Sequence, residues 1–236
     1  RFLPKMRLRQ QYVTSRISGV KYQVIKDFLR DDVAETLSAH IENAKSSQWK
    51  HYYKFGTDDR PLYSDNTIKD EFLKASIYKK LEESLLAGHF TYRLKRLVKC
   101  TDKNCVCDLC SFRREILNSP DFLQFIGGLA NIEGLQLVED FGSVYGHGDF
   151  LSIHPDPNFD VAFILNLSKD WKYEYGGCLT VFDEERPVVI LPEYNSLVLL
   201  YLGEDGVNHY ISEVSKLAPK PRMAVSGWFS RPQNNS

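Results

Sequence analysis

The chain has 236 residues, of which 43% are hydrophobic and 13% aromatic, so it can bury the core of one large domain or of two small ones. Its 30 Lys and Arg residues nearly balance 31 Asp and Glu residues, and the net charge of −1 argues against general nucleic-acid binding and against a membrane-surface protein. No apolar run reaches ~18 residues, so no membrane span is expected.

Helical patterns dominate the chain before residue 132. Apolar residues at three- and four-residue intervals predict a first helix behind two aspartates, and a similar pattern predicts a second helix that ends at Gly88. A third helix opens with Ser119 as its N-cap and Pro120 at its first position. The sequence predicts a short strand over 22–28 and helices over 31–45, 70–88 and 119–132.

The chain after residue 134 shows short β patterns separated by turn residues. No long helix interrupts them, which argues against parallel βαβ winding and favours a barrel or a two-sheet roll. The expected fold is mainly β with α, and the helices are expected to cover one outer face of a sheet. The predicted strands lie near 135–145, 149–154, 160–167, 178–182, 187–191, 196–201, 208–214 and 222–229.

The segment HPD places a histidine and a carboxylate two residues apart. Residues i and i+2 of a strand point to one side, so His154 and Asp156 can face a common point. A histidine, a carboxylate and a distant second histidine form the ligand set that holds non-haem Fe(II) with open positions. His209, 53 residues after Asp156, is the candidate second histidine. Taken alone, HPD also fits a turn, and His209 also fits a core histidine.

Arg222 lies in KPRMAVSGWF, a predicted strand whose other members are mostly apolar or small. An arginine that points into such an interior needs a carboxylate partner, because an unpaired buried charge is very costly. No acidic residue of the chain is an obvious partner. A dicarboxylate cosubstrate, bound bidentately, would supply the missing charge.

Three segments, taken in order and with their spacing, resemble the Fe(II)/2-oxoglutarate-dependent dioxygenases, and among them the prolyl 4-hydroxylase branch. The segments are VYGHGDFLSIHPD, FILNLSKDWKYEYGGCLTVFD and NHYISEVSKLAPKPRMAVSGWF, and the resemblance extends from about residue 22 to 229. It implies a double-stranded β-helix, a jelly-roll or cupin-like barrel with N-terminal helices packed on one sheet. We expect a single domain over 1–236, with a helical support region at about 20–132 and the barrel at about 133–230.

The resemblance also implies roles for individual residues. Two positions depart from the family's usual pattern, namely Ala224, where Ser or Thr is common, and Asn166, where the oxygen-sensing hydroxylases carry a tyrosine. Asn166 is retained as a candidate contact to the cosubstrate. The implied iron ligands are His154, Asp156 and His209; the implied 2-oxoglutarate contacts are Arg222, which pairs with the distal carboxylate, and Tyr145, Ser226, Trp228 and Asn166.

The activity implied by the resemblance is hydroxylation of an unactivated C–H bond, most simply on a prolyl residue of a protein. Fe(II), 2-oxoglutarate and O₂ are the implied cofactors, ascorbate is expected to support activity, and succinate and CO₂ are released. A carboxylate at Asp156 favours hydroxylation, because related halogenases carry a small residue there. The alternatives are a free amino acid or small metabolite as substrate, or a catalytically silent barrel that binds a partner through its cysteine-rich basic segment.

Four of the five cysteines lie in CTDKNCVCDLC, with the spacing C-x4-C-x-C-x2-C. Four thiolates can close a tetrahedral zinc site, but the one-residue link between the second and third favours free thiols over one metal. The odd cysteine count and a start without a signal-peptide pattern predict a reducing compartment, the cytoplasm or the nucleus. The candidate zinc ligands are Cys100, Cys105, Cys107 and Cys110.

Overall fold

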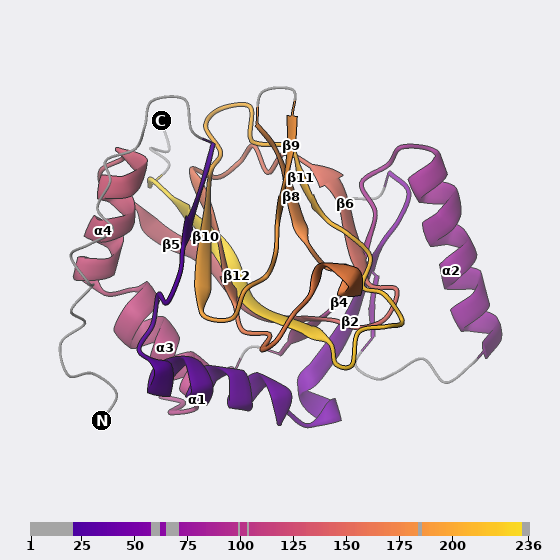
Figure 1. Cartoon of the computed structure of the whole chain (residues 1–236), viewed down its shortest axis with the longest axis horizontal. Helices are drawn as coiled ribbons and strands as arrows, with labels where there is room; N and C mark the ends of the chain where they lie inside the picture. The colour runs from indigo at the N-terminus through magenta and orange to yellow at the C-terminus, as the bar shows by residue number, and fades with distance from the viewer. Residues whose placement is uncertain are drawn as a thin grey trace.

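The computed structural model describes residues 21–57, 62–64, 71–98, 100–102, 104–183 and 186–232 (Figure 1). Its helices are α1 (Asp31–Glu42), α2 (Glu71–Leu86), α3 (Asp108–Phe112) and α4 (Pro120–Ala130), with a π-helical turn η3 (Arg113–Leu117) and 3₁₀ turns η2 (Ser46–Gln48) and η4 (Tyr173–Tyr175). Its strands are β1 (Tyr22–Ile25), β2 (Trp49–Lys54), β3 (Leu62–Ser64), β4 (Tyr92–Leu97), β5 (Gln136–Tyr145), β6 (Phe150–His154), β7 (Val161–Asn166), β8 (Leu179–Asp183), β9 (Arg186–Ile190), β10 (Ser196–Tyr201), β11 (His209–Ile211) and β12 (Arg222–Ser230). The predicted single domain includes residues outside these ranges and stays a prediction.

The strands after residue 134 form the predicted barrel. One antiparallel layer has the order β1-β10-β7-β12-β5, a second has the order β6-β11-β8-β9, and β4 joins them because it pairs with both β5 and β6. Apolar side chains from both layers fill the interior, among them Ile164, Val198 and Ala224 from the first and Val181 and Ile211 from the second. All eight strands predicted in this half are confirmed, and β11 is shorter than expected.

Helices α1, α3 and α4 cover the outer face of the first layer, as predicted (Figure 1). Phe122 of α4 packs against Phe229 of β12, with ring centroids 6.0 Å apart. Ser119 caps α4, since its Oγ accepts a hydrogen bond from the Phe122 backbone N–H at 3.2 Å. The helix ends at Ala130, because Asn131 adopts the left-handed conformation (φ 55°) that stops a helix.

Helix α2 is an exception to the expectation that the N-terminal helices share one sheet face. It lies on the opposite side of the barrel from α4 (Figure 1). Its buried Ile77 and Leu81 form a small separate core with Tyr53 of β2. The residue at which this helix was predicted to start, 70, lies outside the described residues.

Strands β2, β3 and β4 arise in the region where mainly helices were predicted. β2 pairs with β4, and β4 joins the two barrel layers, so the sheet includes strands from the N-terminal half of the chain. Long cationic side chains conceal the alternation of β4, because their guanidinium groups stack on aromatic rings. The Arg96 guanidinium carbon lies 3.8 Å from the centre of the Phe141 ring and 5.1 Å from that of Tyr52.

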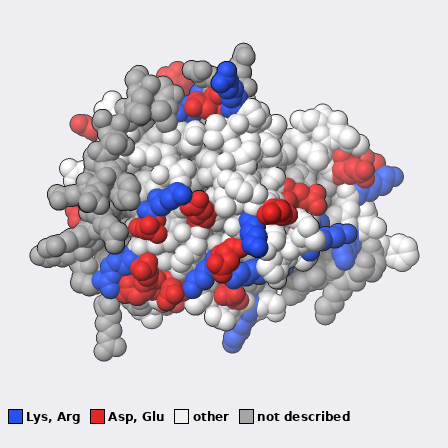
Figure 2. All heavy atoms as spheres, viewed as in Figure 1, with Lys and Arg blue, Asp and Glu red and all other residues white. Residues whose placement is uncertain are grey.

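Acidic and basic side chains are interspersed on the face of the molecule shown in Figure 2. This mixture agrees with the near-zero net charge of the sequence. Among the described residues, no helix combines the length and the apolar character needed to cross a bilayer.

Candidate functional site

The two histidines of the predicted metal set meet across neighbouring strands. His154 ends β6 and His209 begins β11, and the two residues are direct partners in the antiparallel ladder. Their ring centroids are 4.2 Å apart, and both side chains are buried. The rolled sheet therefore brings together two side chains that are far apart in sequence.

Backbone hydrogen bonds fix which nitrogen of each histidine faces the site. Nδ1 of His154 lies 2.9 Å from the Ser152 carbonyl oxygen, and Nδ1 of His209 lies 2.7 Å from that of Val207. A carbonyl only accepts, so each Nδ1 carries a proton, and Nε2 is the nitrogen left to bind a metal. Burial, and then the neighbouring His154, lower the pKa of His209 to about 4, so it is a neutral ligand at ordinary pH.

Asp156 completes the set by a different route from the one expected. It lies beyond the end of β6 in the left-handed conformation (φ 53°), so a turn rather than strand alternation aims its carboxylate. Its Oδ1 lies 3.5 Å from Nε2 of His154, and its Oδ2 lies 3.8 Å from Nε2 of His209. A turn and a metal-facing carboxylate were alternative interpretations of the HPD segment, and the structure contains both.

The turn at Asp156 is held by the segment that precedes His209. The Val207 backbone N–H donates to the Pro155 carbonyl oxygen at 2.8 Å. Gly206, at φ 73°, makes this close approach possible, because a Cβ there would lie 2.1 Å from the same oxygen. The two halves of the site are thus joined through the backbone as well as through their side chains.

Trp228 of β12 donates from Nε1 to Asp156 Oδ2 at 2.8 Å. Its indole also stacks on Phe159, with ring centroids 4.9 Å apart. Such a hydrogen bond orients a metal-binding carboxylate and fixes which oxygen remains for the metal. The sequence pointed to Trp228 as a residue of the pocket wall, whereas the structure places it directly against the carboxylate.

The donor atoms fit an iron ion. One ligand atom from each of His154, Asp156 and His209 lies within 4.8 Å of the others. Two imidazoles and one carboxylate on one side of a cavity match the facial set that non-haem Fe(II) takes, with positions left open for other ligands. These three residues supply all the protein ligands of such a facial set.

The same three residues line a cavity with an empty volume of about 470 Å³, and Arg222 lines it too. The Arg222 side chain is only 1% exposed, and burial lowers the pKa of its guanidinium. Its Nη2 donates to Asn166 Oδ1 at 3.1 Å, while its Nε has no hydrogen-bond partner. Among the described residues, no carboxylate forms an ion pair with Arg222, so its charge is left for a ligand.

The remaining predicted residues surround Arg222 on β5, β7 and β12. Tyr145 is its direct partner in the β5–β12 ladder, with the ring centre 5.2 Å from the guanidinium carbon. Burial raises the pKa of Tyr145, which therefore stays a hydroxyl donor. Ser226 also lines the cavity. Asn166 does not face the cavity directly, because its amide is engaged by Arg222 and by Ser196, whose Oγ accepts from Nδ2 at 3.1 Å.

Sequence reasoning missed two further aromatic residues of the site. Phe90 stacks on His154 with ring centroids 4.5 Å apart, and Phe141 lines the cavity. Phe90 precedes β4, an element that was not predicted, so no sequence signal placed it near the site. His147, the other histidine near this motif, is exposed in its turn, with Nε2 2.9 Å from the Ala218 carbonyl oxygen.

The chain is similar to known proteins both in sequence and in fold. Over 190 residues, the chain is 29% identical to the prolyl 3,4-dihydroxylase OGFOD1 of Ostreococcus tauri, which covers 70% of this chain and 36% of that protein. Over 118 residues, it is 33% identical to the prolyl 3-hydroxylase OGFOD1 of Xenopus laevis, covering 46% of this chain and 23% of that protein. The chain therefore spans less than half the length of these relatives.

Solved structures of low sequence identity share the fold. A Pseudomonas putida prolyl-4-hydroxylase superposes with a TM-score of 0.54 at 17% identity, covering 89% of this chain and 92% of that one. A Trichoplax adhaerens prolyl hydroxylase, solved with a hypoxia-inducible-factor peptide, gives a TM-score of 0.58 at 17% identity, covering 89% and 83%. Residues 141–230 match the family model of the 2OG-Fe(II) oxygenase superfamily, and this range contains the histidine–aspartate–histidine set and Arg222. Over residues 141–230, the barrel of this chain is therefore similar to 2OG-Fe(II) oxygenase domains.

Proposed function

We propose that this protein is an Fe(II)- and 2-oxoglutarate-dependent hydroxylase that acts on a prolyl residue of a protein. The observation that carries the proposal is that one cavity holds both the three convergent metal donors and a buried arginine for which the described part of the chain offers no carboxylate partner. The relatives named as prolyl hydroxylases support the choice of substrate. When bound, iron and 2-oxoglutarate supply the oxidising chemistry with O₂.

In this proposal the chain's own residues bind and orient the cofactors. The Nε2 atoms of His154 and His209 and the carboxylate of Asp156 hold the iron, and Trp228 fixes that carboxylate. Arg222 pairs with the distal carboxylate of 2-oxoglutarate, with Tyr145 and Ser226 beside it in the wall. Asn166 positions Arg222 by accepting its N–H. The apolar remainder of the wall, including Phe141, keeps bulk water away.

Turnover tests this proposal directly. The full chain is incubated with Fe(II), 2-oxoglutarate, O₂ and ascorbate, which we expect to maintain activity, and succinate is measured. Candidate proline-containing peptides are then analysed by mass spectrometry for a gain of one oxygen on proline. Failure to bind or convert 2-oxoglutarate would contradict the proposed reaction. Oxygen gain on a free amino acid, with none on any peptide, would contradict the proposed substrate class alone.

Trp228→Phe is expected to weaken metal binding by about 10- to 100-fold, since orienting hydrogen bonds to metal ligands contribute on this scale. Phenylalanine can keep the stacking on Phe159 but lacks the indole N–H that holds Asp156. The affinity is measured anaerobically with Fe(II), or with Mn(II) as a surrogate. Trp49→Phe is the matched control, because its indole donates to the Ala44 carbonyl oxygen outside the cavity. Equal affinities in the two variants would show that the indole does not orient the carboxylate.

The free thiols of all five cysteines support a reducing compartment, for which the cytoplasm is our first expectation and the nucleus the second.

A further inference from the structure

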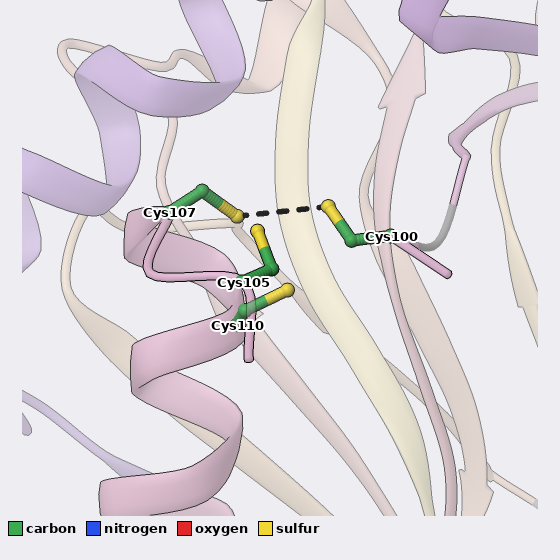
Figure 3. A group of neighbouring side chains, drawn as sticks. All are labelled: Cys100, Cys105, Cys107 and Cys110. Carbon is green, nitrogen blue, oxygen red and sulfur yellow. Dashed lines mark hydrogen bonds between the residues drawn. The ribbon is translucent and has the colours of Figure 1, made fainter. Parts of the chain in front are cut away.

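The four clustered cysteines converge on one point outside the cavity described above (Figure 3). Cys100 follows β4, Cys105 and Cys107 lie in the loop before α3, and Cys110 lies within α3. One sulfur atom from each lies within 4.8 Å of the others, and Sγ of Cys100 is 3.8 Å from Sγ of Cys107. In Figure 3 the four side chains point inward toward a common centre.

The 3.8 Å between Sγ of Cys100 and Sγ of Cys107 is the sulfur–sulfur distance that one tetrahedral zinc ion requires. With zinc–sulfur bonds of about 2.3 Å, the sulfur atoms of a tetrahedral site lie about 3.8 Å apart. A disulfide would instead bring two sulfurs to about 2.05 Å and leave the other two outside the bond. All four thiols of the cluster are free. The arrangement therefore fits four equivalent ligands of one ion better than it fits paired cysteines.

The one-residue link between the second and third cysteines, which was expected to hinder such a site, does not prevent it. Cys107 is the N-cap residue of α3 (φ −63°, ψ 156°), and Cys105 reaches the cluster from the loop before this helix. Cys107 and Cys110 are then brought together by the first turn of α3. Asp102 stabilises the turn that returns the chain, since its carbonyl oxygen accepts from the Cys105 N–H at 3.1 Å.

Cationic side chains lie where the charge of a tetrathiolate site would need them. Four thiolates and one Zn²⁺ carry a net charge of −2. Nη1 of Arg113 lies 3.8 Å from Sγ of Cys110 as a hydrogen-bond donor, and Nη1 of Arg114 donates to the Cys105 carbonyl oxygen at 2.6 Å. The first of these contacts is to a ligand sulfur, where a cationic donor offsets the charge, and the second orients the backbone that carries a ligand.

We propose that Cys100, Cys105, Cys107 and Cys110 bind one structural zinc ion. The site is closed, because four protein ligands complete the tetrahedron and leave no position for substrate. Each thiol releases its proton to solvent as the ion binds. The same Arg113 that contacts the cluster also holds the buried Asp140 of β5 through two hydrogen bonds of 2.6 and 2.7 Å. The zinc thus anchors the connection between β4 and α3 to the first barrel layer.

Zinc content per chain tests the proposal. The histidine–aspartate set also accepts zinc, so the parent for the test is the full-length His154→Ala/His209→Ala variant. It is expressed in zinc-supplemented medium, purified under reducing conditions without chelator, and analysed by elemental mass spectrometry. We expect about one zinc per chain, and at least a tenfold loss after Cys100→Ser/Cys107→Ser. These two positions are less buried than Cys110, which favours folding of the variant.

Cys178→Ser is the matched control, because Cys178 is a buried free thiol that does not belong to the cluster. It should keep the full zinc content. A second readout needs no cysteine variant: Co(II) added to the metal-free parent should give the visible bands and near-ultraviolet thiolate charge transfer of a tetrahedral tetrathiolate site, at one equivalent. Zinc should displace these bands.

Three results would overturn the zinc site. These are a parent that takes up no zinc while all its thiols stay reactive, a Cys100→Ser/Cys107→Ser variant that retains the ion, and a cluster isolated with iron in place of zinc. None depends on hydroxylation, since the parent lacks the proposed iron ligands. A failed zinc site and a failed hydroxylase proposal are therefore distinguishable.

Discussion

Replacing His154 with alanine is expected to lower the conversion of 2-oxoglutarate to succinate by about 1,000-fold or more. Two donors, Asp156 and His209, would remain, and they cannot hold the ion in a facial geometry. Loss of a catalytic metal removes several kcal/mol of stabilisation from the transition state, and each 1.4 kcal/mol is tenfold in rate. Succinate formation under saturating 2-oxoglutarate measures the effect, and a thermal melt establishes that the variant is folded.

His147→Ala is the matched control for this loss. His147 lies seven residues before His154 in the same motif, but it is exposed and contacts the Ala218 carbonyl oxygen rather than the cavity. Its replacement should leave the turnover within about twofold of the wild type, as is usual for surface changes away from a site. A folded His154→Ala variant that kept a tenth of the wild-type rate would exclude His154 as an essential ligand.

Arg222→Met is expected to weaken 2-oxoglutarate binding by about 100-fold or more without loss of stability. Methionine fills a similar volume but cannot form the two charge-assisted hydrogen bonds, each of about 1.5–3 kcal/mol, that a carboxylate would make. The ligand-free protein should become more stable, by roughly 1 kcal/mol, because a buried guanidinium with an unpartnered Nε is removed. Binding is measured calorimetrically with Mn(II), and stability by denaturant unfolding.

Arg113→Met is expected to have the opposite effects, a loss of stability with unchanged 2-oxoglutarate binding. Arg113 is paired with the buried carboxylate of Asp140, so its loss leaves that charge uncompensated and should cost about 3 kcal/mol. Because Arg113 lies outside the cavity, 2-oxoglutarate affinity should not change. If Arg222→Met destabilised the protein as much as Arg113→Met and left binding intact, Arg222 would be a structural residue.

The barrel could be predicted because its strands carry local signals. Short apolar runs separated by glycine, proline and aspartate mark each strand after residue 134, and their number and the lack of long helices exclude parallel winding. Candidates for the site could be found for a related reason. Arg222 stands out as a charge within an apolar strand, His154 by its two-residue spacing from Asp156, and His209 by its place in the order of the motifs. Their mutual placement depends on ladder register, which sequence patterns alone do not fix.

Other features were decided by contacts that no local pattern encodes. β4 carries Arg93 and Arg96, and its stability as a strand depends on tertiary partners such as Asp149 and Phe141. The orientation of Asp156 depends on a left-handed turn held by the distant Val207 backbone N–H. The convergence of the cysteines likewise depends on the backbone angles of a loop.

The direct pairing of His154 with His209 has a consequence for folding kinetics. β7, β8, β9 and β10 lie between them in the chain, so the two rings meet only after a long loop has closed. A chain in which β6 and β11 are not yet paired therefore lacks the proposed iron-binding geometry. Under the proposed function, iron uptake would report that this long-range pairing has formed.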